Sequence, residues 1–284
     1  DLLSIPKNNV IKTMMSSGTS GQEVSRIYLD KETSAFQVKV LSRIVSDFIG
    51  PKRLPMLVID SKSIVSNREK FSARSAGVLG FSMFGRDVEF ALDHDMSINF
   101  ERVREFLEKY KDDNILIFGF TFIVWNHFIE ELERLETKLN ISNGILIHGG
   151  GWKQMELQSV SNEEYKKRLF NIVNIKRVHN YYGMVEQTGS IFMECECGFL
   201  HASSYSDIII RNHANYHSKE IGERGLIQLL SVIPKSYPGH SLLSEDIGKI
   251  HGVDDCKCGR KGKYFKVYGR MENAETRGCS DTYT

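Results

Sequence analysis

Residues 178–187 read VHNYYGMVEQ, and this stretch separates two halves of the sequence that have different patterns. Before it, short apolar runs alternate with segments in which apolar residues recur at helical spacing. These patterns predict strands at 54–60, 88–92, 115–118, 145–148 and 178–181, and helices at 36–48, 71–84, 100–110, 122–139 and 161–170. Short strands that alternate with helices are typical of a mostly parallel sheet covered on both faces. Residues 1–189 are therefore predicted to form an α/β domain.

The pattern changes after about residue 189. Strand-like runs follow at 191–194, 208–211, 225–233, 247–251 and 264–268, and Gly, Asn, Asp and Pro separate them. No long helical pattern interrupts these runs, which favours a β-rich subdomain. We expect this subdomain to occupy residues 190–270 and a C-terminal arm to occupy residues 271–284.

The composition excludes several classes of protein. Of 284 residues, 41% are hydrophobic and 26% are charged, which is ordinary for a soluble globular protein and unlike a disordered or collagen-like chain. Lys and Arg number 37 against 36 Asp and Glu, so the sequence shows no electrostatic footprint for nucleic acid or an anionic membrane. The longest apolar run, 115–125, is shorter than the roughly 20 residues of a membrane helix. The first residues do not form a signal peptide, and because residue 1 is Asp and not Met, we expect an N-terminal segment to be missing. We expect a cytoplasmic protein with no membrane span and no nucleic-acid partner.

A loop rich in hydroxyl groups and glycine lies near the start. Its residues are Ser16, Ser17, Gly18, Thr19, Ser20 and Gly21. Glycines let backbone N–H groups approach an anion closely, and the hydroxyls can donate further hydrogen bonds to phosphate oxygens. The Gly-Lys-Ser/Thr ending of the common P-loop is absent. A polar surface loop remains the alternative.

Three further motifs follow in order. They are Tyr181-Tyr182-Gly183 with Glu186, then Glu245-Asp246-Ile247-Gly248, then Gly269-Arg270. Together with the phosphate loop, this order resembles the adenylate-forming superfamily, which includes acyl-CoA synthetases, luciferases and peptide-synthetase adenylation domains. The resemblance implies an α/β adenylate-forming core with mostly parallel sheets flanked by helices, plus the β-rich subdomain. The superfamily's small C-terminal domain, with its catalytic lysine, is expected to be absent because only 14 residues follow Arg270.

Further segments give a closer resemblance. The segment 146–153 reads LIHGGGWK, 256–260 reads CKCGR, and 277–282 reads RGCSDT. These segments resemble the LuxE-like acyl-protein synthetases, to which phenylacetate-CoA ligases are more distantly related. In that family the carboxylate of the substrate acid attacks the α-phosphate of ATP. The reaction releases pyrophosphate and leaves an acyl-adenylate.

The resemblance assigns roles to the motif residues. Residues 16–21 would hold the β- and γ-phosphates of ATP, and Glu186 would help to hold Mg²⁺, a cation that prefers oxygen ligands. Tyr182 would stack on adenine, with Tyr181 and Gly183 beside it. The turn formed by Gly149, Gly150 and Gly151 would line the other side of adenine. Asp246 would accept hydrogen bonds from the ribose hydroxyls, and Arg270 would assist at the ribose or phosphate.

Each of these residues also has an ordinary structural interpretation. Glu186 alone could be a solvated acid and Tyr182 a half-buried aromatic residue. Asp246 could stabilise a turn, and Arg270 could form a surface ion pair. An acyl pocket is expected at Phe118, Gly119, Phe120 and Trp125 with the 71–84 helix, although such aromatic residues also form plain core.

Four cysteines form two similar units, Cys195-Glu196-Cys197-Gly198 and Cys256-Lys257-Cys258-Gly259. Cys195, Cys197, Cys256 and Cys258 could supply the four soft ligands of a structural Zn²⁺ site. One-residue spacing is tighter than usual for zinc, and His201 could replace one thiolate. Free thiols and disulfides are the alternatives.

Cys279 stands apart, close to the C-terminus. In LuxE-like proteins a cysteine at this place carries the acyl group as a thioester, and a thiolate is a capable nucleophile toward an acyl-adenylate. An idle exposed thiol is the alternative.

The sequence therefore predicts ATP-dependent activation of a carboxylic acid, most simply a fatty acid, followed by acyl transfer to Cys279 and onward to a partner protein such as a reductase or carrier. The expected catalytic residues are Cys279, Glu186 and Arg270. Two other functions remain open. One is an acyl-CoA ligase related to phenylacetate-CoA ligase, and the other is a non-catalytic scaffold that binds a nucleotide or acyl-adenylate.

Overall fold

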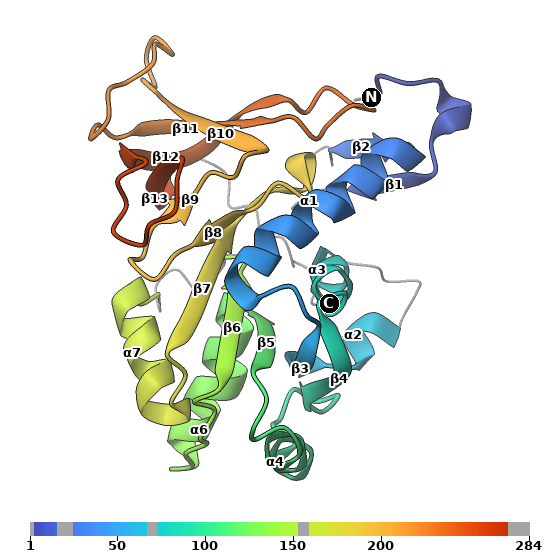
Figure 1. Ribbon diagram of the computed structural model, residues 1–284, viewed down its shortest axis with the longest axis vertical. Helices are drawn as coiled ribbons and strands as arrows, with labels where there is room; N and C mark the ends of the chain where they lie inside the picture. The colour runs from blue at the N-terminus through green and yellow to red at the C-terminus, as the bar shows by residue number, and fades with distance from the viewer. Residues whose placement is uncertain (1–2, 16–24, 67–72, 153–158, 272–284) are drawn as a thin grey trace. The chain divides into compact units, whose positions relative to one another are not determined.

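Figure 1 shows the computed structural model, which describes residues 3–15, 25–66, 73–152 and 159–271. By their internal contacts, the described residues divide into two units. Unit 1 contains residues 3–48 and 181–271, and unit 2 contains the residues from 49 to 180. The division falls between Asn180 and Tyr181, inside a strand, whereas the sequence pattern changes near residue 190.

Unit 2 is built on a sheet with the strand order β4-β3-β5-β6-β7. The strands are β3 (Leu54–Ser61), β4 (Gly85–Leu92), β5 (Ile115–Phe120), β6 (Gly144–Gly149) and β7 (Arg177–Tyr182). β3 pairs in parallel with β4 and with β5, and β5 pairs in parallel with β6. Every residue of β5 and β6 is buried, as expected where a parallel sheet is covered on both faces. The α/β class predicted from the sequence is confirmed.

The helices of unit 2 connect these strands. They are α2 (Ser63–Ser66), α3 (Ala73–Ser82), α4 (Phe100–Lys109), α5 (Thr121–Val124), the π-helical turn η2 (Trp125–Ile129), α6 (Glu130–Arg134) and α7 (Asn162–Val173). Side-chain caps begin two of them, because Asn99 accepts from the N–H of Arg102 and Ser161 accepts from the N–H of Glu164. The helix predicted at 122–139 ends at Arg134, since Glu136 adopts a left-handed φ of 49°.

Unit 1 contains an antiparallel sheet. Its strands are β8 (Phe192–Glu194), β9 (Leu200–His201), β10 (Ser206–Arg211), β11 (Gly225–Ser231), β12 (Ser241–Val253) and β13 (Lys263–Arg270), in the order β10-β11-β12-β13-β9-β8. Tyr181 and Tyr182, at the end of β7, pair with β8. One face of this sheet forms an apolar core of Phe192, Leu200, Ala202, Ile208, Ile210, Ile227, Leu229, Ile250 and Phe265. The prediction of a β-rich region after residue 190 is confirmed.

The N-terminal part of unit 1 adds a hairpin and a long helix. After the 3₁₀ turn η1 (Lys7–Asn9), β1 (Lys12–Met15) pairs antiparallel with β2 (Arg26–Leu29), and α1 (Lys31–Ile49) follows. Gly189 has a φ of 90°, and a Cβ at this position would lie 2.8 Å from the carbonyl oxygen of Gln37. Only glycine therefore allows the loop after β7 to approach α1 this closely.

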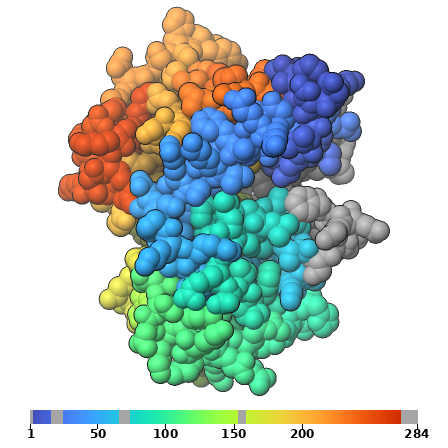
Figure 2. All heavy atoms as spheres, turned by 45° about the vertical axis from the view of Figure 1, so that its right-hand side comes forward, coloured from blue at the N-terminus to red at the C-terminus, as the bar shows by residue number. Residues whose placement is uncertain are grey.

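One loop of unit 1 extends into solvent. Residues 213–218 and 220–224, between β10 and β11, are exposed, and they belong to the orange projection at the top of Figure 2. Among the described residues, no helix combines the length and the apolar character that crossing a membrane requires.

Candidate active site and metal centre

Asp246, Tyr182 and Arg270 meet at one end of the unit 1 sheet. Asp246 lies in β12 opposite Arg270 of β13, at a register shift that ends at Gly248. The Tyr182 hydroxyl donates to Asp246 Oδ2 at 2.6 Å, and Arg270 Nε lies 3.5 Å from Asp246 Oδ1. The Asp246 side chain is 17% exposed. The structure thus brings together three residues that lie far apart in the sequence and that the sequence assigns to the nucleotide site.

Tyr182 keeps its proton in this arrangement. Burial raises the pKa of Tyr182 well above its usual value, and the nearby Asp246 carboxylate raises the pKa further. The hydroxyl therefore remains a donor toward Asp246 over the physiological range. The ring packs near Phe192 and Phe265, with centroid separations of 6.2 and 6.3 Å. Tyr182 is thus both part of the core and the residue that orients the Asp246 carboxylate.

Glu186 lies in the 3₁₀ turn η4 (Val185–Gln187) that follows β7. The neighbouring Gln187 is buried, and its Nε2 donates to the carbonyl oxygens of Gly239 at 2.8 Å and Leu229 at 3.3 Å, which fixes the turn. Glu186 itself is half-buried and has no hydrogen-bond or ion-pair partner among the described residues. Burial raises the pKa of Tyr237 to about 12, and the Glu186 charge contributes to that shift. A half-buried carboxylate on a held turn, with no such partner among the described residues, fits the chemistry of a cation ligand.

The Gly149–Gly151 turn belongs to unit 2. Gly150 and Gly151 adopt φ values of 87° and 64°, which glycine permits at little cost. The Thr121 hydroxyl donates to the Gly149 carbonyl oxygen at 3.0 Å and lies 2.9 Å from His148 Nδ1. Because that hydroxyl has a single proton, Nδ1 of His148 must carry the proton in this contact. Burial lowers the pKa of His148 to about 3, so the ring is neutral.

Four side chains of unit 1 converge in a metal-type cluster. The ligand atoms of Cys195, His201, Cys256 and Cys258 all lie within 4.8 Å of one another. The Sγ atoms of Cys195 and Cys256 are 3.9 Å apart, those of Cys256 and Cys258 are 3.4 Å apart, and Cys258 Sγ is 3.5 Å from His201 Nε2. Tetrahedral zinc with Zn–S of ~2.3 Å and Zn–N of ~2.0 Å would separate its ligand atoms by roughly 3.5 to 3.8 Å. The donor set and its spacing therefore fit a closed zinc site.

The cluster corrects the first choice of ligands made from the sequence. Cys197 is exposed and lies outside the cluster, whereas His201 on β9 supplies the remaining donor atom. Both Cys-x-Cys-Gly units form the same turn, in which the first cysteine's carbonyl oxygen accepts from the glycine N–H at 2.9 Å. The first turn nevertheless leaves Cys197 in solvent. The cysteines of the described residues are free thiols, which disagrees with the disulfide alternative.

The thiols of the cluster have unequal proton affinities. Burial raises the pKa of Cys195 to about 11 and also raises that of Cys256. At Cys258 burial also acts to raise the pKa, but hydrogen bonds from the Arg260 backbone and from Cys256 outweigh it and lower the pKa. Cation binding would require the thiols to release their protons, so affinity for the metal rises with pH.

Two predicted site segments lie outside the described residues. These are the phosphate loop, residues 16–21, and Cys279. Their assigned roles remain predictions.

The family assignment comes from sequence comparison. The family model "Acyl-protein synthetase, LuxE" matches residues 1–284. The chain belongs to the LuxE acyl-protein synthetase family. The resemblance inferred from the motifs is therefore confirmed. A search of curated proteins gave no match.

Solved structures share the fold of this LuxE-family chain. A 2-hydroxyisobutyryl-CoA ligase in complex with 2-HIB-AMP and CoA is 17% identical, with a TM-score of 0.69 over 96% of this chain and 60% of that one. ATP-bound MatB from Rhodopseudomonas palustris is 15% identical, with a TM-score of 0.58 over 94% of this chain and 49% of that one. A long-chain-fatty-acid-CoA ligase from Archaeoglobus fulgidus is 16% identical, with a TM-score of 0.61 over 94% and 52%. The chain has the fold of an adenylate-forming ligase core and spans about half to three fifths of these proteins.

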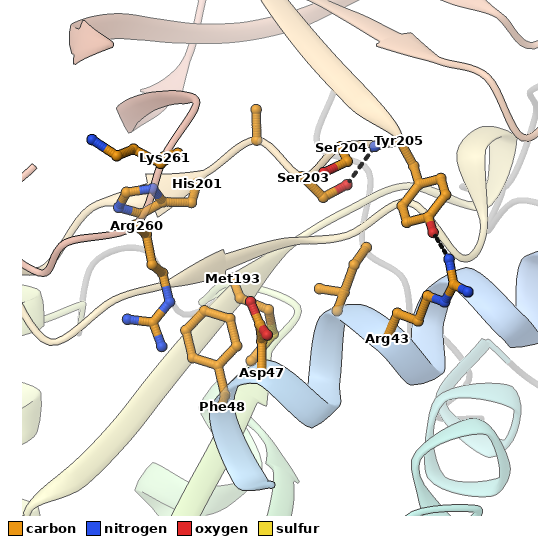
Figure 3. Close-up of a pocket in the computed structure, with 12 residues that line it drawn as sticks. Arg43, Asp47, Phe48, Met193, His201, Ser203, Ser204, Tyr205, Arg260 and Lys261 are labelled. Carbon is orange, nitrogen blue, oxygen red and sulfur yellow. Dashed lines mark hydrogen bonds between the residues drawn. The ribbon is translucent and has the colours of Figure 1, made fainter. Parts of the chain in front are cut away.

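A pocket of about 400 Å³ adjoins the metal-type cluster of this LuxE-family chain (Figure 3). At one end the Arg43 guanidinium of α1 donates to the Tyr205 hydroxyl. At the other end Arg260 lies 4.1 Å from the centroid of the Phe48 ring and donates to Glu196 at 2.8 Å. Both arginines thus already contact protein groups, and they attach α1 to the connections around β9.

The expected acyl-pocket residues are closely packed within unit 2. The Phe118 ring stacks on Phe81 with a centroid separation of 4.3 Å, and it contacts Phe120 at 5.8 Å. A Cβ on Gly77 would lie 2.8 Å from the Phe120 ring. In this structure these residues form core, which was the alternative interpretation of the aromatic pattern.

Sequence reasoning missed two interactions of the predicted site residues, one in each unit. Thr121 was not singled out, although its hydroxyl holds both His148 and Gly149. Its position directly after the strand of residues 115–120 was a usable signal, because ligands bind at the carboxyl ends of parallel strands. The second is the Tyr182 hydroxyl as partner of Asp246, for which the sequence contains no signal.

Proposed function

We propose that this protein activates a carboxylic acid, most simply a fatty acid, with ATP and then transfers the acyl group to a thiol. The contacts among Tyr182, Asp246 and Arg270 support the proposal, because the family resemblance assigns all three residues to the nucleotide site of a LuxE-family chain. Two proteins of similar structure were solved with an adenine nucleotide bound, one with 2-HIB-AMP and one with ATP. These complexes support the proposal that this chain binds a nucleotide.

In the first step a carboxylate oxygen of the acid would attack the α-phosphorus of ATP. The bond from that phosphorus to the bridging oxygen breaks, pyrophosphate leaves, and an acyl-adenylate remains. Asp246, oriented by the Tyr182 hydroxyl, would accept hydrogen bonds from the ribose hydroxyls, and Arg270 would oppose negative charge nearby. Glu186 would contribute an oxygen ligand for Mg²⁺, which would offset the charge of the phosphates. The family resemblance also assigns nucleotide binding to residues 16–21 and to Gly149–Gly151.

In the second step the Cys279 thiolate would attack the acyl carbon. The bond from that carbon to the AMP oxygen breaks, AMP leaves, and a thioester forms. A partner protein such as a reductase or carrier would then take the acyl group. We also propose that zinc, held by Cys195, His201, Cys256 and Cys258, braces unit 1 without taking part in catalysis, and that the protein works in the cytoplasm, where thiols stay reduced.

Pyrophosphate exchange into ATP, measured with a panel of carboxylic acids, tests the first step. We expect exchange with at least one acid and a loss of about 100-fold in Asp246→Ala, since this removes the ribose acceptor. Asp207→Ala is the matched control, because Asp207 is an acid of the same unit whose ion pair is with Lys263, and it should keep full exchange. Absence of exchange with every acid would instead favour the scaffold alternative.

Acyl transfer with labelled acid tests the second step. Cys279→Ser should keep pyrophosphate exchange but lose the covalent label, and Cys197→Ser is its control. Undiminished labelling of Cys279→Ser would refute the thioester role. Release of acyl-CoA by the wild type when CoA is added would favour the CoA-ligase alternative.

A further inference from the structure

The outer face of the unit 1 sheet carries an unusual pair of like charges. Lys249 of β12 and Lys266 of β13 lie directly opposite each other in the register. Their neighbours Ile250 and Phe265 belong to the core on the other face, so both lysines lie on the outer face. Like charges directly opposite on a sheet are destabilising. The fold therefore keeps this pair at a cost in stability.

Other cationic and aromatic groups surround the two lysines. Lys266 Nζ lies 5.0 Å from the centroid of the Phe199 ring, and the Arg224 guanidinium lies 4.0 Å from that of Tyr268. His251 lies between these rings, with Nε2 3.0 Å from the Tyr268 hydroxyl and its ring 4.9 Å from Phe199. We call these six residues, Phe199, Arg224, Lys249, His251, Lys266 and Tyr268, the basic patch.

No carboxylate of the described residues neutralises the basic patch. Arg224, Lys249 and Lys266 form no ion pair with Asp or Glu in the part of the chain that the structure describes. Nearby cations do find such partners, for example Lys263 with Asp207 at 2.9 Å and Arg260 with Glu196 at 2.8 Å. Burial lowers the pKa of His251, and the charges of Lys249 and Lys266 lower it further. The patch is therefore a site of positive potential on a half-exposed surface, and β13 lies in the red part of the molecule in Figure 2.

We propose that the basic patch docks an acidic segment of a partner protein. The proposal rests on charge complementarity, because the closely spaced cations of the basic patch would attract successive carboxylates of an acidic segment. The aromatic rings favour a protein over a nucleic acid, since cations already cover the faces of Phe199 and Tyr268 on which bases would stack. Cation–π contacts also hold Lys266 and Arg224 in place before binding, which reduces the entropy lost on docking. The proposal goes beyond acid activation and does not depend on it.

Fluorescence anisotropy with a labelled oligoglutamate peptide at low ionic strength tests this surface. We expect Lys249→Glu/Lys266→Glu to weaken binding by about tenfold or more. Lys12→Glu/Lys52→Glu is the matched control, because it changes the net charge equally at two exposed lysines elsewhere, and it should bind nearly as the wild type does. Equal weakening by the control would overturn the proposal, since net charge alone would then explain binding. Binding of a labelled oligothymidylate through Lys249 and Lys266 at least as tightly as the peptide would also overturn it.

Thermal unfolding of the same variants gives a second readout that does not need a ligand. Lys249→Glu alone turns a like-charge pair into an opposite-charge pair and should raise the unfolding midpoint while it weakens peptide binding. Lys249→Glu/Lys266→Glu restores a like-charge pair and should return the midpoint toward that of the wild type. A lower midpoint in Lys249→Glu would mean that the lysines support the fold, and the argument for the basic patch would fail.

Discussion

The two units differ in how far their strands and charged side chains are buried. In unit 2, β5 and β6 are buried along their whole lengths, and a charge that enters the interior is paired there. Asp60 and Arg74, with side chains 1% and 7% exposed, form two contacts of 2.7 and 2.5 Å. In unit 1, β12 alternates between buried and partly exposed residues. The difference arises because a parallel sheet is covered on both faces, whereas an antiparallel sheet can leave one face open.

This difference explains where the candidate chemistry lies. Glu186, Asp246 and the basic patch all belong to unit 1, where side chains can be fixed by the sheet and still meet a ligand. In unit 2, taken by itself, the predicted site residues are the Gly149–Gly151 turn, next to which lies the neutral His148. Three changes test this difference between the units.

The largest effect is expected at the cluster of Cys195, His201, Cys256 and Cys258, where we propose that a zinc ion braces the open sheet of unit 1. His201→Ala and Cys258→Ser each remove a ligand atom, so the zinc content should fall from about one ion per chain to nearly none. The midpoint of thermal unfolding should fall more than it does in the variants of Asp60 and His148 described below. Elemental analysis and thermal unfolding measure both quantities. Cys197→Ser is the control, and zinc loss in that variant would contradict the ligand set proposed here.

The next effect concerns the buried ion pair of unit 2. Asp60→Ala leaves the Arg74 charge without this carboxylate in the interior, and the free energy of unfolding should fall by about 3–5 kcal/mol. Chemical denaturation measures this change. Asp60→Ala/Arg74→Met removes both charges and should recover much of the loss. A loss below about 1 kcal/mol in Asp60→Ala, as for a surface ion pair, would mean that the pair is not buried in solution.

Near neutral pH the smallest effect concerns His148, because its contribution appears only as the pH falls below about 6.5. Its pKa is about 3 in the folded protein because of burial, against ~6.5 in the unfolded chain, so below pH 6.5 the unfolded state binds a proton that the folded state does not. The free energy of unfolding should therefore be unaffected by His148 above pH 6.5 and fall by about 1.4 kcal/mol for each pH unit below it, down to about pH 3. Denaturation at several pH values measures this slope, and His148→Gln should have a shallower one. An NMR titration in which the ring protonates near pH 6 would refute the expectation.

The sequence predicted the strands of unit 2 well, because parallel strands buried on both faces are continuous apolar runs. The run at 115–118 extends in the structure to Phe120, and the run at 145–148 extends to Gly149. The helix predicted at 122–139 is confirmed as far as Arg134 but ends earlier than expected, because apolar periodicity did not reveal the left-handed φ of Glu136. It also did not reveal the π-helical turn at Trp125–Ile129.

In unit 1 the sequence identified the residue types but not their partners. The Asp246 to Tyr182 hydrogen bond and the Lys249–Lys266 pair both depend on the strand register. Irregularities beside Gly248 and Gly252 set that register, and a shift by one residue would move each side chain to the other face. The choice of His201 over Cys197 likewise depends on a hairpin turn and not on spacing along the chain.

The two Cys-x-Cys-Gly turns show which sequence motif describes the cluster of donor atoms. Although the turns look like a repeated motif, only one of them supplies both of its thiols to the cluster. The pattern that matches the folded donor atoms is Cys, five intervening residues and His, followed by Cys, one residue and Cys. With zinc bound as we propose, a substitution at position 197 should be tolerated, whereas position 201 should require a side chain that can coordinate a metal.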